Sequence, residues 1–295
     1  MVDLAVSGPI ARPSQWRAGF ARGGPRLWIG VGLVGFFVLI ALLAPLLAPH
    51  DPIEQDLLSA QLPPAWMQGG EVTFPLGTDS LGRCVLSRLM YAARTAIAVA
   101  LIAASLAAII GIAFGLIAGM FGGWIDQVVS RLIDVWMAFP PVLLSIVLAA
   151  VIGAGLTSVI AAIVVVDWTR FARVVRAETM VQLQRDYASA ARALGLSRGQ
   201  ILRLEILPNL VPLIVTLFAV EMGIAILVEV ILSFVGISVA GDVATWGGMI
   251  VEGRQVIYQA PWIMAFPIGC VILSVIGFNL LGDGLRAALD PVQRR

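Results

Sequence analysis

Charge is scarce in this sequence of 295 residues, of which 13% are charged and 60% are hydrophobic. A soluble globular domain carries about 25% charged residues, and a chain of this size cannot bury so much apolar surface in one aqueous core. The net charge of +1 also lacks the basic excess of a nucleic-acid-binding protein. The composition therefore excludes a soluble enzyme, a disordered protein and a nucleic-acid binder, and it leaves a helical protein that crosses a membrane several times.

Several reactive residue types are absent or nearly so. There is no lysine, because all 19 basic residues are arginines, so the chain has neither a GxxxxGK phosphate loop nor a Schiff-base lysine. His50 is the only histidine, which excludes multi-histidine metal sites and histidine-based triads. The two cysteines, Cys84 and Cys270, form no CxxC pair. We expect no metal, no cofactor and no catalytic residue here, so any nucleotide chemistry belongs to a partner.

Uncharged stretches predict the membrane spans, because about 20 apolar residues cross the roughly 30 Å of hydrocarbon in a bilayer. The stretch at 135–166 is too long for one crossing at about 1.5 Å per residue, and the sequence Gly153-Ala154-Gly155 divides it. The sequence therefore predicts an all-α polytopic membrane protein with six transmembrane helices, near 27–49, 95–125, 137–153, 157–176, 207–234 and 256–282.

The arginines predict the orientation of these spans. Fifteen lie in the N-terminal segment, the 121–134 connection, the 170–203 loop or the C-terminal tail, and four lie on the opposite side. Because cytoplasmic loops are rich in Lys and Arg, both termini are expected in the cytoplasm, although Arg88 and Arg94 run against this rule.

The predicted organisation follows from the spans and their orientation. The first span is expected to be a retained helix and not a cleaved signal peptide. The parts are a cytoplasmic segment at 1–26, a first transmembrane helix at 27–49, an extracytoplasmic loop at 50–94, a five-helix core at 95–285 with a cytoplasmic coupling loop at 178–208, and a cytoplasmic tail at 286–295.

A stripe of small residues marks the second span. It recurs at every fourth position, at Ala103, Ala107, Gly111, Gly115 and Gly119. Small residues let helices approach closely in a membrane. Packing within the chain is the favoured interpretation, and a subunit seam or a pore-facing surface is the alternative.

Charged residues inside the spans are few. Glu221 and Glu229 are the only acids in the fifth span and lie about 80° apart around its axis. They either line a translocation pathway or bond to neighbouring helices. Asp167, near the inner end of the fourth span, is expected to pair with Arg170 three residues further on.

The cytoplasmic loop contains a predicted helix–turn–helix. Its alanine-rich start favours a helix, and Gly195 suits the position that ends it. Ser197 with Gln200 predicts a capping box that opens a second short helix. The small side chains of the first helix suit close docking against another protein, whereas a solvated connector would not need them.

This loop resembles the characteristic cytoplasmic loop of permease subunits of ATP-binding-cassette importers. That loop has Glu-Ala-Ala, then a glycine and a Leu-Pro pair at fixed spacing, and here Ser189 replaces the glutamate while Glu205 stands at a usually apolar position. The resemblance assigns the coupling to ATPases to Ser189, Ala190, Ala191, Arg192, Gly195, Leu196, Ser197, Leu207 and Pro208.

A second motif is similar to one in the C-type permease of dipeptide and oligopeptide importers. The family's Gly-Thr-Asp-x-x-Gly-Arg-Asp element is matched by Gly77, Thr78, Asp79, Gly82 and Arg83. Cys84 stands in place of the final aspartate. Turn structure is the favoured role for this element, and docking of a binding protein is the alternative. Shorter similarities lie at 121–126, 232–236, 245–247, 278–286 and 289–291.

The resemblance implies a multi-pass permease of a bacterial inner membrane with the type I importer fold. Its implied partners are a second, B-type permease, two cytoplasmic ATPase subunits and an extracytoplasmic binding protein, which together work by alternating access. The expected cargo is a dipeptide or oligopeptide, with nickel chelates or glutathione as alternatives. A secondary transporter is less favoured because no internal repeat is evident, and an intramembrane enzyme would need polar catalytic pairs that the spans lack.

Overall fold

The computed structural model describes residues 24–237 and 243–289. Within these residues the regular structure is helical, apart from one isolated β-bridge between Thr78 and Cys84, so the predicted all-α class is confirmed. Most of the predicted N-terminal segment and tail, and the end of the 289–291 similarity, lie outside the described residues.

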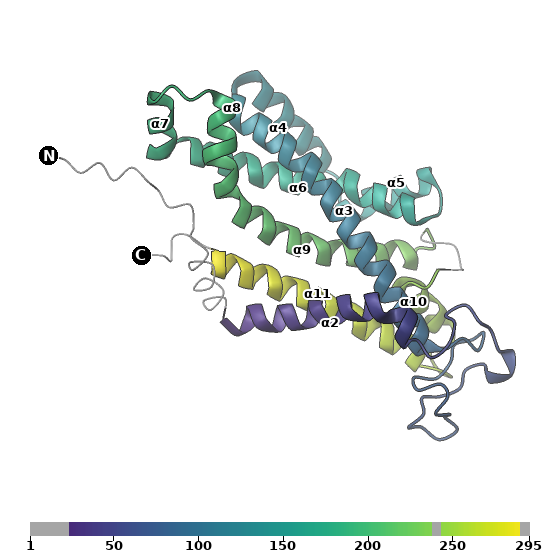
Figure 1. The fold of residues 1–295 in the computed structure, drawn as a ribbon. Helices are drawn as coiled ribbons and strands as arrows, with labels where there is room; N and C mark the ends of the chain where they lie inside the picture. Colours follow the sequence, from purple (N-terminus) through teal and green to yellow (C-terminus); the bar gives the residue numbers. More distant parts are fainter. Residues whose placement is uncertain (1–23, 238–242, 290–295) are drawn as a thin grey trace.

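Five long helices run roughly along one axis of the molecule (Figure 1). They are α2 (Gly24–Leu47), α3 (Val85–Phe121), α6 (Leu156–Leu183), α9 (Leu207–Phe234) and α11 (Trp262–Leu289). α3 packs along α6, and α11 packs against both α2 and α9. The shorter elements are η1 (Leu57–Ser59), α4 (Gly123–Met137), α5 (Pro141–Ile152), α7 (Asp186–Ala193), α8 (Arg198–Ile201), the π-helical segment η2 (Leu202–Ile206) and α10 (Trp246–Gln255).

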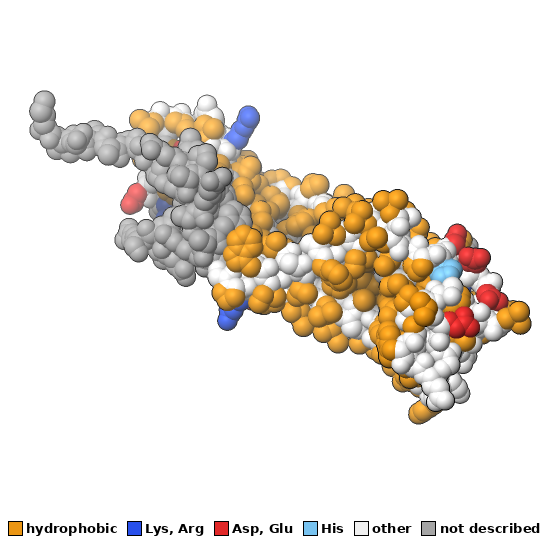
Figure 2. Space-filling model, turned by 60° about the horizontal axis from the view of Figure 1, so that its bottom comes forward, with side chains coloured by type: hydrophobic (Ala, Val, Ile, Leu, Met, Phe, Trp, Pro, Cys, Tyr) orange, Lys and Arg blue, Asp and Glu red, His pale blue; other side chains and the backbone are white. Residues whose placement is uncertain are grey.

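The two ends of the molecule differ in character. α7 and α8 lie at the end where α2 begins and α11 finishes, whereas residues 48–84 form a lobe beside α10 at the opposite end (Figure 1). Hydrophobic side chains cover much of the face between the ends, and acidic side chains gather with the single histidine at one end (Figure 2). A belt of this kind suits contact with lipid, because a membrane-spanning surface is apolar at mid-height.

Four helical segments are long and apolar enough to cross a membrane: α2, α3, the continuous segment Arg198–Phe234 and α11. α4 and α5 together would make a fifth, although the pair is bent by 86° at its junction. α6 is long enough but carries Asp167 near its middle and Arg170, Arg173 and Arg176 in its second half. By length and composition alone, the described residues therefore support four or five spans.

Three boundaries differ from the predicted ones. α3 begins at Val85 and not near 95, because the arginines at its start are accommodated within the helix. The stretch predicted at 137–153 contains α5, a helix of 12 residues that reaches only about 18 Å at 1.5 Å per residue and cannot cross alone. The last predicted span starts late, at Trp262, because a separate helix, α10, precedes it.

The predicted break between the third and fourth spans is confirmed. α5 ends at Ile152 and α6 begins at Leu156. Gly153 and Gly155 between them have φ values of 106° and 148°, which residues with a side chain rarely adopt. Pro141 occupies the first position of α5, where proline fits a helix.

The small-residue stripe of α3 packs against α6, as the favoured interpretation expected. A Cβ atom added at Gly111 would lie 2.3 Å from the carbonyl oxygen of Trp168. One added at Gly115 would lie 2.7 Å from the carbonyl oxygen of Ala172, and Gly119 meets the same helix in the same way. The stripe is therefore an intramolecular seam at which two backbones touch.

Candidate functional site

The hairpin formed by α7 and α8 projects from the end of α6 and has a small core of its own. Ala191 is buried in one apolar cluster with Ile201, Ile206 and Leu210 from the second arm. Ala188, one turn earlier in α7, is fully buried as well. Because this cluster ties α7 to the start of α9, the hairpin is a packed element and not a solvated connector.

The turn between α7 and α8 has the features that the sequence predicts. Gly195 has a φ of 82°, and the N–H of Leu196 donates to the carbonyl of Ala191 at 3.1 Å, which is the bond of a Schellman motif. The N–H of Ser197 donates to Oε1 of Gln200 at 2.8 Å, and the N–H of Gln200 donates to Oγ of Ser197 at 3.4 Å. The capping box is therefore present.

Arg192 connects α7 to the end of α6. Its Nη2 donates to the carbonyl of Leu183 at the end of α6 at 2.8 Å and to Oγ of Ser189 at 3.3 Å. Its Nε donates to the carbonyl of Ala188 at 3.3 Å. A cation is also favoured beside the carbonyls that end a helix, so this one side chain stabilises the ends of two helices.

The exposed face of the hairpin differs in part from the predicted one. Ala190 and Gly195 are exposed, but Ala191 points inward because the second arm folds over that side of α7. Leu194, at the end of α7, is 75% exposed, and an apolar side chain presented in this way indicates a contact surface. Of the other predicted coupling residues, Ser189, Arg192, Ser197 and Pro208 are exposed, whereas Leu196 and Leu207 are half-buried.

The two glutamates of α9 are buried within the chain, each with 1% of its surface exposed. Arg170 lies beside Glu221 and Asp167, with its Nη1 3.8 Å from Oε2 of Glu221 and its Nε 3.7 Å from Oδ1 of Asp167. The predicted Asp167–Arg170 pair is thus confirmed, and it extends across to α9. Ser233 donates to Oε1 of Glu229 at 2.7 Å. Neither glutamate reaches the surface in this conformation, and their role in a pathway stays a prediction.

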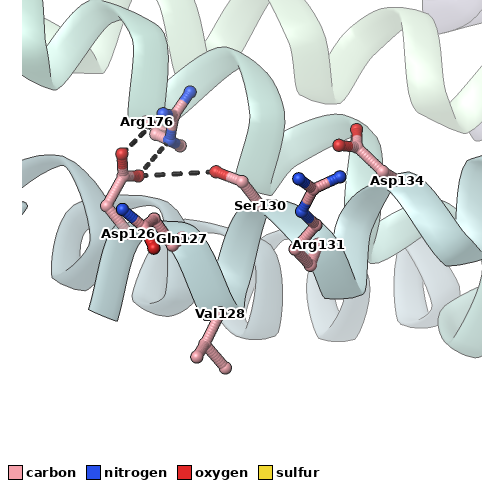
Figure 3. Close-up of a pocket in the computed structure, with 7 residues that line it drawn as sticks. All are labelled: Asp126, Gln127, Val128, Ser130, Arg131, Asp134 and Arg176. Carbon is pink, nitrogen blue, oxygen red and sulfur yellow. Dashed lines mark hydrogen bonds and ion pairs between the residues drawn. The ribbon is translucent and has the colours of Figure 1, made fainter. Parts of the chain in front are cut away.

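A groove on α4 and α6 holds further ion pairs (Figure 3). The Nη2 of Arg176 lies 2.7 Å from Oδ2 of Asp126, and the hydroxyl of Ser130 is 3.5 Å from the same carboxylate. Arg173 pairs with Asp134 at 2.9 Å. These two ion pairs each join a carboxylate of α4 to an arginine of α6. We therefore interpret the groove as part of the contact that attaches α4 to α6.

The Gly-Thr-Asp motif lies inside the lobe of residues 48–84. Asp79 is fully buried and accepts hydrogen bonds from the N–H of Arg83 at 3.0 Å and from its Nε at 2.7 Å. The hydroxyl of Thr78 accepts from the N–H of Leu62 at 2.8 Å and donates to the carbonyl of Ser59. The motif therefore makes hydrogen bonds within the lobe, and a role in docking stays a prediction.

Two residues that the sequence pattern did not single out as partners complete this buried network. Arg88, 3% exposed, donates to Asp79 and, through Nη2, to Oε1 of Glu252 at 3.1 Å. The Nη2 of Arg83 donates to Oε2 of Glu252 at 2.8 Å. The network joins the lobe to α3 and α10, and it pairs the charge of Arg88, one of the two arginines that run against the predicted orientation. The only signal in the sequence for this network was that Arg88 runs against the charge rule.

Cys84 stands at the N-cap of α3 without capping it. It is 1% exposed and its side chain makes no capping hydrogen bond. We expect Cys84→Ser to raise the free energy of unfolding by about 1 kcal/mol, because a serine hydroxyl at the N-cap accepts from a backbone N–H at the second or third position of the helix. Thermal unfolding in detergent measures the effect, with Cys84→Ala as the matched control. Equal stability of the Ser and Ala variants would contradict the prediction.

Two family models match the chain. The model described as binding-protein-dependent transport system inner membrane component matches residues 111–295, which include the α7–α8 hairpin. The model described as N-terminal TM domain of oligopeptide transport permease C matches residues 25–64, which include α2 and the beginning of the lobe.

Curated relatives cover most of the chain. The di/tripeptide transport system permease protein DppC of Pseudomonas aeruginosa is 37% identical over 254 residues, 86% of this chain and 84% of the relative. The dipeptide transport system permease protein DppC of Escherichia coli K12 is 40% identical over 264 residues, 89% and 88% of the two chains. The glutathione transport system permease protein GsiD of Salmonella paratyphi A is 38% identical over 293 residues, 96% and 94% of the two chains.

Proposed function

Since the chain belongs to the family of binding-protein-dependent transport system inner membrane components, we propose that it forms, with a second permease, the membrane path of an ATP-driven importer. Two cytoplasmic ATPase subunits supply the energy, and an extracytoplasmic binding protein delivers the cargo. The chain itself hydrolyses nothing. Family membership also argues against the secondary transporter that the sequence left open.

The observation that carries this proposal is the α7–α8 hairpin. It is a packed element with an exposed apolar residue, Leu194, at the far end of the molecule from the lobe. Through Arg192 it is joined to the end of α6, and α6 packs against the three glycines of the α3 stripe. A displacement of the hairpin by an ATPase is thereby passed to the membrane helices, as alternating access requires.

We propose six spans with both termini in the cytoplasm. The bent pair α4–α5 serves as the third span and α6 as the fourth, because Asp167 faces Arg170 and Arg176 faces Asp126, which offsets the charges of α6. Paired charges are tolerated at membrane depth where isolated ones are costly. The arginine distribution supports this orientation.

The topology predicts the labelling of two engineered cysteines. In a chain from which Cys84 and Cys270 have been replaced, a membrane-impermeant maleimide applied to intact cells should label Val72→Cys, which is 87% exposed in the lobe. It should label Ser197→Cys, exposed in the hairpin, only after the membrane is opened. Labelling of position 197 in intact cells would contradict the proposed orientation.

We propose peptides as the cargo, because curated relatives over most of the chain are dipeptide or di/tripeptide permeases. Glutathione is the second candidate, because permeases named for it are similarly identical. Co-expression with the second permease, the ATPase subunits and the binding protein tests the proposal. The ATPases should co-purify with the chain, and proteoliposomes that contain the complex should take up labelled dipeptide. Failure of the ATPases to co-purify would overturn the proposed function. Uptake of glutathione without uptake of dipeptide would make glutathione the cargo.

A further inference from the structure

The lobe carries a tip formed by residues 53–58, with the sequence Ile53-Glu54-Gln55-Asp56-Leu57-Leu58. All six residues are exposed, and two adjacent leucines stand out, with Leu57 69% and Leu58 98% exposed. The lobe lies beyond the helices at the end opposite the hairpin (Figure 1). Adjacent leucines presented to water on such a surface indicate an interface with another molecule.

The tip is held in one shape by its own hydrogen bonds. Asp56 accepts from the hydroxyl of Ser59 at 2.6 Å and from the N–H of Leu58 at 3.1 Å. These bonds, that of Ser59 foremost, hold the pKa of the Asp56 carboxyl below its usual range. A negative charge is therefore fixed directly beside the two leucines at neutral pH.

The buried Gly-Thr-Asp motif forms the platform of this tip. Thr78 holds the carbonyl of Ser59, and the N–H of Gln61 donates to the carbonyl of Asp79 at 2.9 Å. Gly82 lies directly under the tip, because a Cβ atom there would be 1.7 Å from the carbonyl oxygen of Asp56. A surface fixed before binding loses little conformational entropy when a partner arrives, so the motif preorganises the tip without touching the partner.

We propose that the tip docks into an apolar pocket with a basic rim on the extracytoplasmic binding protein. This inference rests on the proposed function and adds to it the surface and the chemistry of the contact. Asp51, Glu54 and Asp56 lie within seven residues of the leucines in the sequence and are exposed, and residues 48–82 contain no arginine or lysine. An acidic surface repels anionic lipid head groups and a second copy of itself, and it steers a cationic protein toward the apolar contact.

The affinity of the binding protein for the whole importer in lipid nanodiscs tests the role of the leucines. The double variant Leu57→Ser, Leu58→Ser should bind at least about tenfold more weakly, as expected when the apolar centre of an interface is removed. The matched control is Val72→Ser, which removes an equally exposed apolar side chain of the lobe outside the tip. It should bind as the wild type does.

The charge is tested separately. Glu54→Arg reverses one exposed charge beside the leucines and should slow association and flatten its dependence on salt concentration. The wild-type dependence, measured in parallel, should show association slowing as salt is added. If Glu54→Arg associated at the wild-type rate at every salt concentration, the proposal of a basic rim on the binding protein would be overturned.

Three results would overturn the docking of the tip. In the first, the double variant binds like the wild type. In the second, it loses the second permease on purification. In the third, it retains affinity, and the fluorescence of a label on the wild-type tip is quenched by a lipid-phase probe. The last two would place the tip against the other permease or in the bilayer. If the wild-type importer bound no binding protein, the proposed function would fail with it. If both wild type and variant bound equally, this inference alone would fail.

Discussion

Gly115→Leu is expected to abolish the folded protein. A Cβ atom at this position already lies 2.7 Å from the carbonyl oxygen of Ala172 and 2.9 Å from the Cβ of Val175, and leucine adds three more carbons. Overpacking a core costs about 1–3 kcal/mol where side chains can yield, and here part of the obstacle is backbone. We expect the cost to exceed that range, because α3 and α6 must separate. The yield of monodisperse protein in detergent and its thermal unfolding measure the effect.

The matched control for this substitution is Gly32→Leu. Gly32 is also a helical glycine, in α2, and a Cβ atom there meets nothing within 4 Å in the described structure. This variant should be produced and should unfold like the wild type. If Gly115→Leu were equally well produced and equally stable, the close contact between α3 and α6 would not exist in the membrane.

Leu194→Glu should leave the permease folded but reduce transport and ATPase binding about a hundredfold or more. Leu194 is 75% exposed, so the substitution removes little from the core of this chain. If the side chain is buried against an ATPase, the glutamate leaves an unpaired charge in the interface, and such a charge costs about 3–5 kcal/mol. A tenfold change in affinity corresponds to about 1.4 kcal/mol. Co-purification of the ATPases and cargo-stimulated ATP hydrolysis measure the effect.

Two controls separate the surface from the fold and from charge alone. Leu194→Met preserves the apolar volume and should be nearly neutral. Gly199→Glu places the same charge in the first turn of α8, where there is open space and a carboxylate is favourable, and it should be much milder. If Leu194→Glu kept wild-type ATPase co-purification and cargo-stimulated ATP hydrolysis, this face of the hairpin would not be part of the ATPase contact. Gly195 is a poorer test position, because its φ of 82° strains any replacement.

Local features of the fold were predictable from the sequence. The capping box at Ser197, the break at Gly153 and the helix start at Pro141 each depend on residues a few positions apart, whose backbone preferences act without tertiary help. The α3 stripe was predictable as well, since small residues at every fourth position share one face. The helix it would meet was not, because any neighbouring helix satisfies such a stripe.

Features that depend on distant partners were not predictable. The junction of α4 and α5 contains Pro140 and Pro141, but these two prolines alone do not predict the bend of 86° between the helices. The inward orientation of Ala191 depends on the second arm folding back over α7, and a helical wheel of α7 alone cannot reveal it. Arg192 donates to a carbonyl of another helix. The sequence of α7 does not reveal this partner, so a solvated arginine was the natural expectation.

The buried network of the lobe has a consequence for the biogenesis of the protein. Asp79 meets Arg83 four residues away and Arg88 nine residues away, whereas Glu252 lies 164 residues from Arg88. During synthesis Asp79 is therefore available to pair with Arg83 and Arg88 long before Glu252 has been made. Glu252 emerges only after the rest of α3, the bent pair α4–α5, α6 and α9 have been made. The local ion pairs of the lobe can thus form early in synthesis, whereas its attachment to α10 waits for the closing stages of folding.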